Sequence, residues 1–196
     1  MESAEDDPQD LPDRIAPGVR LLLCGINPGR HSFEQGHHYA GPGNRFWPAL
    51  HAAGITPGLW APERDVELPT LGVGLTNLAS RWTRAAAELE AAELQRGGQR
   101  LLGRVAELEP RVVAVLGVGA FRIAFARPAA QAGDRLDARE LVGDATLDLR
   151  PGAEVHVLPN PSGLNAHFPL AEQARLLRRA ALAAGLSLQP PRGGRL

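Results

Sequence analysis

The sequence contains no lysine, a single cysteine and no long apolar run. Without lysine, no side-chain amine can form a Schiff base with a substrate. Cys24 alone cannot build a disulfide framework, a four-cysteine zinc site or a cysteine-ligated iron–sulfur cluster. No run reaches the roughly 18 apolar residues of a membrane span, so we expect none. The acidic start is unlike a secretory signal, and these features together favour a reducing cytoplasm.

The charge is distributed unevenly along the chain. The 196 residues are 44% hydrophobic, which is enough for one domain with a full core. Residues 1–10 hold five acidic and no basic residues, whereas the rest holds 21 arginines and 17 acidic residues. We expect an acidic, disordered tail at residues 1–12, a single domain at 13–186 and a second tail at 187–196. The arginines suit phosphate binding, although a coding bias could also explain them, so nucleic-acid binding is permitted but not required.

Apolar runs alternate with helical patterns along the chain. The runs predict strands at residues 19–24, 71–78, 112–116 and 154–158. The helical patterns predict helices at residues 44–53, in the Ala- and Glu-rich stretch after 83, from the Gly97-Gly98 interruption to 108, at 120–125 and at 170–184. We expect irregular loops at 25–43 and 55–70, and turns with a short strand or hairpin at 127–151. This alternation predicts a three-layer α/β/α fold around a central, mainly parallel sheet of four or five strands.

Two of the predicted strands are followed by Asn-Pro segments. Asn27-Pro28-Gly29 follows the first strand, and Asn160-Pro161-Ser162-Gly163 follows the last. Asn, Pro and Gly are favoured in turns, so either segment could be only a turn. The carboxyl ends of parallel strands meet at one edge of the sheet, where open α/β sheets bind ligands. The pair therefore favours a cleft lined by both segments.

A third segment, residues 37–47, combines glycines with His37, His38 and Tyr39. Its glycines allow a close backbone approach, and Tyr39 offers an aromatic face for stacking. The two histidines could indicate a metal, but no cysteine or paired carboxylate stands nearby, so we expect none. Gly117-Val118-Gly119 resembles half of a dinucleotide fingerprint without its remaining features, and we interpret it as a tight strand-to-helix turn.

In this order and spacing, the three segments resemble the mismatch-specific uracil/thymine-DNA glycosylase family of the uracil-DNA glycosylase superfamily. The motifs that carry the resemblance are Gly25–Gly29, residues 36–47 and Asn160–Leu164, and the likeness covers roughly residues 12–185.

The resemblance implies a monofunctional hydrolase that acts without a cofactor. It would flip uracil, or thymine or another modified pyrimidine, opposite guanine out of double-stranded DNA. Hydrolysis of the N-glycosidic bond would leave an abasic site for base-excision repair. We expect a monomer that acts on the bacterial nucleoid in the cytoplasm. The alternative is a DNA- or nucleotide-binding module on the same scaffold without efficient turnover.

By this resemblance, Asn27 positions the attacking water. An amide can orient water but is a poor general base, so we expect slow catalysis that depends on the leaving group. Thr83 could hold the same water or could only cap a helix. Glu88 and Glu93 could supply a carboxylate, or they could lie on a solvated helix face.

The resemblance also implies a base pocket. Tyr39 would stack on the base, and backbone groups around Ile26 and Gly29 would meet its polar edge. Ser32 would lie near the 5-position and is small enough to admit thymine. The remaining pocket residues are His38, Asn44 and Asn77, of which Asn77 could instead be a satisfied turn amide.

The wedge that fills the gap left in the duplex would come from the last Asn-Pro loop. Its residues are Asn160, Ser162, Gly163, Leu164 and Asn165. Some relatives carry an arginine here that contacts the widowed guanine. This chain has Asn165-Ala166, which leaves opposite-base discrimination open. Arginines of the last helix, Arg175, Arg178 and Arg179, could meet phosphate or could lie on a solvated face.

Overall fold

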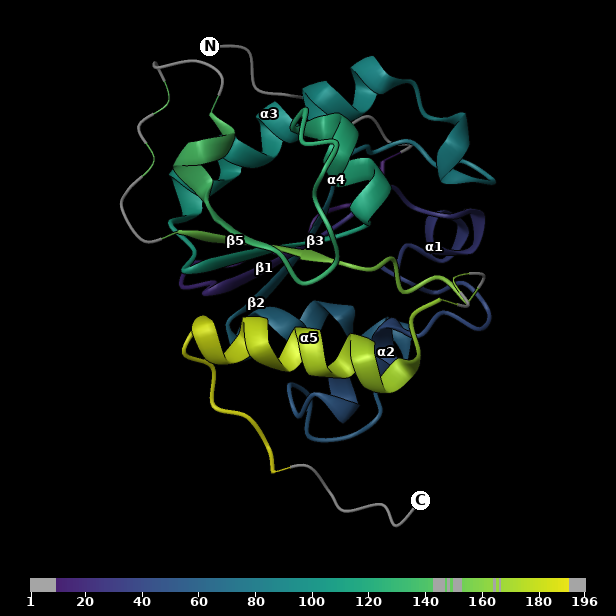
Figure 1. Cartoon of the computed structure of the whole chain (residues 1–196). Coiled ribbons are helices and arrows are strands. Elements are labelled where there is room, and N and C mark those ends of the chain that lie inside the picture. The colour runs from purple at the N-terminus through teal and green to yellow at the C-terminus, as the bar shows by residue number, and fades with distance from the viewer. Residues whose placement is uncertain are drawn as a thin grey trace.

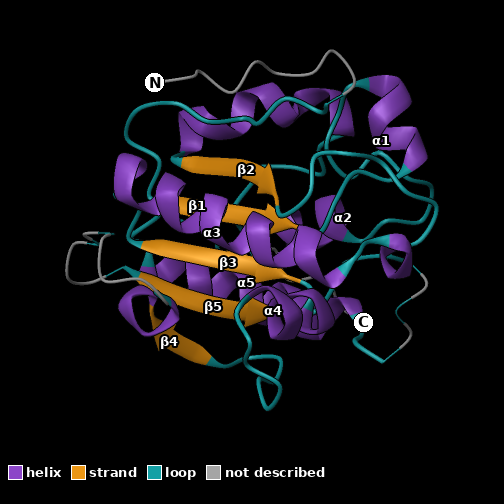
Figure 2. Cartoon of the chain, turned by 90° about the horizontal axis from the view of Figure 1, so that it is seen from above, coloured by secondary structure: helices purple, strands orange, loops and turns teal. Residues whose placement is uncertain are grey.

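The computed structural model describes residues 10–142, 147, 149, 153–163, 165 and 167–190. Its centre is a five-stranded sheet in the order β2-β1-β3-β5-β4 (Figure 2). The parallel strands are β1 (Leu21–Gly25), β2 (Val73–Asn77), β3 (Val112–Leu116) and β5 (Glu154–Leu158). The edge strand β4 (Arg135–Asp137) runs antiparallel to β5. The predicted α/β/α fold with a mainly parallel sheet is confirmed.

Helices cover both faces of the sheet (Figure 1). On one face lie α2 (Phe46–Ala52) and α5 (Leu170–Ala183), which pack against Leu21, Leu23 and Ala114. On the other lie α3 (Ala91–Leu108) and α4 (Val118–Ala124), which pack against Leu22 and Val113. Because both faces are covered, every residue of β1 and β3 is buried, which explains their continuous apolar sequences.

The predicted interruption at Gly97-Gly98 is wrong, because α3 continues through both residues. A side chain at Gly97 would collide with the carbonyl group of Leu78, and one at Gly98 would meet the carbonyl oxygen of Ala124. The two glycines therefore let α3 approach two backbone segments closely. These glycines therefore indicate close packing of the helix against other segments, and they do not mark a helix end.

Two segments that we predicted to be irregular contain short helices. The 25–43 stretch holds α1 (Arg30–Gln35), which ends at Gly36 in the left-handed conformation. The 55–70 stretch leads into the 3₁₀ helix η1 (Pro62–Leu71). The helix predicted after residue 83 begins with only a 3₁₀ turn, η2 (Ala86–Glu88), before α3 starts.

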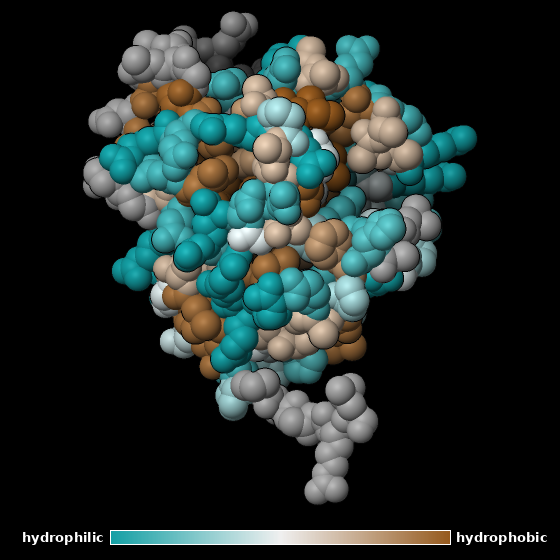
Figure 3. Space-filling model, in the orientation of Figure 1, coloured by the Kyte–Doolittle hydropathy of each residue, from teal (hydrophilic) through white to brown (hydrophobic). Residues whose placement is uncertain are grey.

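The predicted region of turns with a short strand, residues 127–151, contains the edge strand β4. A further 3₁₀ helix, η3 (Ala138–Leu141), follows β4 within the predicted 127–151 turn region. Residues 1–9 and 191–196 of the predicted tails lie outside the described residues. In the described part of the chain, no helix is long and apolar enough to cross a membrane. On the face shown in Figure 3, apolar residues form separate patches among hydrophilic ones.

Candidate active site

A cavity of about 220 Å³ opens at the carboxyl ends of β1, β2 and β5, where the loops after these strands converge. Both residues of the predicted catalytic pair, Asn27 and Thr83, line it. All residues of the predicted base pocket line it as well, namely Ile26, Gly29, Ser32, His38, Tyr39, Asn44 and Asn77. The last loop contributes Asn160, Ser162 and Gly163. Segments that are far apart in the sequence thus share one cavity.

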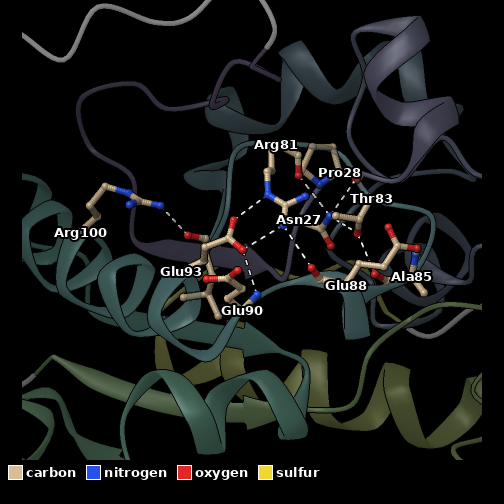
Figure 4. A network of polar contacts seen from close by, with 10 residues as sticks. Asn27, Pro28, Arg81, Thr83, Ala85, Glu88, Glu90, Glu93 and Arg100 are labelled. Atoms are coloured by element: carbon tan, nitrogen blue, oxygen red, sulfur yellow. Dashed lines mark hydrogen bonds and ion pairs between the residues drawn. The ribbon is translucent and has the colours of Figure 1, made fainter.

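The side-chain amide of Asn27 is held in one orientation. Its Nδ2 donates to Thr83 Oγ1 at 2.8 Å and lies 3.2 Å from the carbonyl oxygens of both Pro28 and Arg81 (Figure 4). Three acceptors around one atom fix that atom as the nitrogen. The Oδ1 atom accepts no hydrogen bond from any residue that the structure describes. It is therefore the atom that can accept a hydrogen bond from a water in the cavity.

Thr83 orients Asn27 and does not cap a helix. Its hydroxyl accepts from Asn27 and donates to the carbonyl oxygen of Ala85 at 2.9 Å. The hydroxyl proton is therefore already used within the protein. Thr83 also pairs with Gly29 in an isolated bridge, which ties its segment to the loop after β1. The residue that precedes η2 as its cap is Ala85.

Glu88 and Glu93 do not line the cavity. Both oxygens of Glu93 bind the Arg81 guanidinium, at 2.6 and 2.9 Å, and one also accepts from the Glu90 amide (Figure 4). The Arg81 guanidinium lowers the pKa of Glu93 to about 2. Glu88 accepts from the Ala85 amide at 3.2 Å. Both carboxylates bind the backbone at the start of a helix, and Glu93 is a weak base because Arg81 stabilises its charge.

Tyr39 presents a supported aromatic plane to the cavity. Its ring stacks on Phe46 with centroids 3.8 Å apart and planes 16° from parallel. Phe46 covers one face, so a planar ligand in the cavity can stack only on the other. Tyr39 adopts the left-handed conformation with φ of 56°, which is uncommon for a residue with a large side chain. Its hydroxyl oxygen is buried without a hydrogen-bond partner among the described residues.

Asn77 meets Tyr39 at the end of β1. A side chain at Gly25 would collide with Asn77 Oδ1 and with the Tyr39 hydroxyl, so glycine is required for both to reach this point. The side-chain amide of Asn77 makes no hydrogen bond to a described residue, which argues against the alternative that it only satisfies a turn. Its donor and acceptor are therefore available to a ligand.

A buried carboxylate, which the sequence did not reveal, anchors the Tyr39 loop. Asp65 in η1 accepts from Arg14 Nε at 2.9 Å and from the His38 backbone amide at 2.8 Å, and lies 3.2 Å from His37 Nδ1. The Asp65 side chain is completely buried. Arg14 also donates to the Gly36 carbonyl oxygen. No local pattern marks an aspartate in a proline-containing segment as the partner of a loop 27 residues away.

His38 is buried beneath the same loop. Its Nε2 lies 3.0 Å from the carbonyl oxygen of Pro12, and its own carbonyl oxygen accepts from Trp47 Nε1 at 3.3 Å. Burial lowers the pKa of His38 to about 4, so its ring is neutral at physiological pH. Among the described residues, no three His, Cys, Asp or Glu side chains are grouped closely enough to share a metal ion.

Arg45, just before α2, braces the last loop. Its guanidinium donates to the carbonyl oxygens of Asn165 at 3.1 Å and Phe168 at 3.0 Å. Gly163 packs so closely on Gly43 that a side chain would collide with that backbone. Asn165 does not line this cavity but donates to the Asn160 carbonyl oxygen. The predicted wedge residue Leu164 and also Ala166 lie outside the described residues.

The three arginines of α5 do not line the cavity. Arg175 pairs with Glu172 at 2.6 Å on the exposed face. Arg178 donates to the Ala53 carbonyl oxygen at 3.0 Å, and Arg179 donates to that of Gly133. Arg178 and Arg179 therefore connect α5 to other parts of the fold.

Comparison with known families agrees with this geometry. The structure is a three-layer α/β/α fold with a cavity, lined partly by asparagines, at the carboxyl ends of its parallel strands. The family model of the uracil DNA glycosylase superfamily matches residues 12–182, and the chain belongs to this superfamily. Members of the superfamily are DNA glycosylases, hydrolases that act on DNA in its repair.

Proposed function

We propose that this protein is a monofunctional DNA glycosylase that flips uracil opposite guanine out of duplex DNA and hydrolyses its N-glycosidic bond. The observation that carries the proposal is the Asn27 amide. Its nitrogen is held by three acceptors, and its oxygen is left for a water. The cavity around it combines this water site with a stacking plane and unused polar groups at one sheet edge.

In the proposed reaction, the flipped base enters the cavity and stacks on the free face of Tyr39. The Asn77 amide meets the polar edge of the pyrimidine. The bond between C1′ and the base nitrogen breaks with its electrons moving to the base, and the sugar gains oxocarbenium character. The water on Asn27 then adds to C1′. Its proton passes to solvent or to the departing base, because the amide is too weak a base to take it.

Positioning of the water by Asn27 requires neither Glu88 nor Glu93 in this proposal, and neither carboxylate lines the cavity. Ser32 supports acceptance of thymine and other 5-substituted pyrimidines. It is a small side chain that lines the cavity, and its hydroxyl accepts from the Ala40 amide at 3.0 Å. That hydrogen bond holds the side chain back against its own loop.

The test is release of free base from U·G and T·G duplexes under single-turnover conditions. Asn27→Ala should lower the rate by about a hundredfold or more, because the attacking water is no longer held in position. Thr83→Val should also lower it, since valine cannot accept from Asn27, whereas Thr83→Ser should retain most of the rate. Full activity of Asn27→Ala would refute the mechanism. Tight product binding without base release would favour the alternative of a binding module, and strict uracil selectivity would refute the role of Ser32.

A further inference from the structure

Two aromatic side chains are next to cavity residues in the sequence but do not themselves line the cavity. Phe33 follows Ser32 in α1, and Trp82 precedes Thr83. Their rings stack with centroids 6.3 Å apart and planes 26° from parallel. Trp82 is 37% exposed, whereas the other tryptophans, Trp47 and Trp60, are buried. An aromatic surface supported from behind is therefore open to solvent next to a residue that holds Asn27.

Arg84 places a positive charge at the same point. It is exposed and lines the cavity, yet it forms no hydrogen bond or ion pair with any residue in the described ranges. The neighbouring arginines are engaged, Arg30 with Glu34 at 2.7 Å and Arg81 with Glu93 at 2.6 Å. The Arg84 guanidinium is thus available to an anion, and it suits the two-oxygen face of a phosphate.

We propose that Trp82 and Arg84 form a binding site for single-stranded DNA next to the flipped nucleotide. Trp82 stacks on an unpaired neighbouring base with Phe33 behind it, and Arg84 binds a phosphate of the same strand. Aromatic side chains beside basic ones are the means by which proteins bind single strands. In a duplex the neighbouring base is paired and stacked within the helix, so it has no face to offer Trp82. The inference rests on the proposed function for the identity of the ligand as DNA.

The position of Trp82 gives a direct optical test. The probe is a single-stranded oligonucleotide with one tetrahydrofuran abasic analogue, which cannot be cleaved, and the same strand annealed opposite guanine. Tryptophan fluorescence should fall on binding the single strand, because a base stacks on the exposed indole. The fall should disappear in Trp82→Phe. A fall that persists in this variant would come from Trp47 or Trp60 and would refute the stacking contact.

Affinity measurements separate the two strand states. Trp82→Ala should weaken single-strand binding by about tenfold, since stacking on one aromatic ring contributes a factor of about 5 to 150. Duplex binding should weaken by less than about threefold. The matched control is Leu182→Ala, which removes an exposed apolar side chain of α5. Equal losses for both strand states would refute a single-strand contact.

Arg84 is tested by the salt dependence of the same binding. Arg84→Ala should reduce the slope of log affinity against log salt by about 0.7 for the single strand, which corresponds to one lost phosphate contact. The control is Arg139→Ala. Arg139 comes after β4 in the sequence and pairs with Asp137, which lies opposite the first residue of β5, whereas the cavity lies at the carboxyl ends of the parallel strands. An unchanged slope in Arg84→Ala would refute the phosphate contact.

These binding tests are independent of turnover. If the wild-type protein releases no uracil but the Trp82 and Arg84 effects are present, the proposed function fails and the strand site stands. If uracil is released while both variants bind single strands like the wild type, the strand site fails and the proposed function stands. Thermal unfolding of each variant verifies that it has folded.

Discussion

In the proposed reaction, the two polar atoms of the Asn27 side chain have different partners, because the nitrogen binds the protein and the oxygen binds the attacking water. Its nitrogen interacts with Thr83 and two carbonyl oxygens, and this leaves its oxygen free to accept a hydrogen bond from a water. An amide orients a water without removing its proton, so this geometry contributes mainly by positioning. In the proposed reaction, the rest of the barrier would be lowered by stabilising the departing base, for which the cavity offers Asn77 and the Tyr39 plane.

Asp65 contributes to the same site from a distance by fixing the Tyr39 loop. Asp65→Asn should reduce the free energy of unfolding by about 2–3 kcal/mol, because a buried charged acceptor with three partners is lost. It should also raise KM for a U·G duplex, since Tyr39 depends on this loop. Urea unfolding and steady-state kinetics measure the two effects.

The matched control for Asp65 lies in the same 3₁₀ helix. The Glu67 side chain is 45% exposed and pairs with Arg64 at 2.6 Å, and such surface pairs contribute less than about 1 kcal/mol. Glu67→Gln should therefore leave both the unfolding free energy and KM near the wild-type values. If Asp65→Asn matches Glu67→Gln in both measurements, Asp65 is not an anchor of the loop.

Among the elements of the fold, α3 holds the segment between Asn77 and Thr83 in place. Arg100 donates to the Leu78 carbonyl oxygen at 2.7 Å, and Glu93 binds Arg81. Gly97 brings the helix against the same Leu78 backbone. Three residues of α3 therefore contact the segment between Asn77 and Thr83, which connects the packing of the helix to the orientation of Asn27.

Replacing two glycines of α3 with alanine, one at a time, should change Tm in opposite directions. Gly97→Ala should lower Tm, because the new methyl group would collide with rigid backbone at a cost of about 1–3 kcal/mol. Gly103→Ala meets nothing within 4 Å and should raise Tm, since alanine is favoured over glycine in a helix by about 1 kcal/mol. Calorimetry of both variants gives the comparison. A rise in Tm for both would contradict the close approach of α3 to Leu78.

Strands β1 and β3 were predictable because each is a continuous apolar run between turn residues, and burial on both faces requires that pattern. The helix α1 was not, because six residues without an apolar stripe leave no periodic signal. Gly97 and Gly98 misled the prediction for a related reason. Their effect depends on Leu78 and Ala124, which the sequence separates from them by many residues.

In the site, too, some features could be predicted from the sequence and others could not. The motif residues after β1 and β5 could be brought together because parallel topology alone places strand ends at one edge. The anchors Asp65 and Arg45 could not, since each acts through contacts across the fold that have no local pattern. Thr83 was found by resemblance, but its bonds to Asn27 and Ala85 require coordinates.

Across the molecule, the loops that build the cavity also contribute to the stability of the fold. His38 packs against the N-terminal segment through Pro12, against α2 through Trp47 and against η1 through Asp65. The charged or titratable groups that act on its ring are Asp65, Arg14 and His37. Protonation of this one ring therefore places a charge where three elements meet.

We expect acid to unfold the protein partly through His38. Burial lowers its pKa in the folded state to about 4, against about 6.5 in an unfolded chain. The unfolded state then binds more protons between these values, so the contribution of His38 is fully present above about pH 6.5 and is lost as pH falls toward 4. The loss amounts to about 3 kcal/mol.

Urea unfolding of wild type and His38→Gln between pH 7 and 4.5 tests this expectation. Glutamine can still donate to the Pro12 carbonyl oxygen but does not titrate, so the variant should lose less stability over this range. The buried His156, whose pKa burial also lowers, provides an internal comparison. It remains in both proteins and should give both a residual dependence of the same sign. Identical pH dependences of the two proteins would show that the His38 ring is not buried in its neutral form.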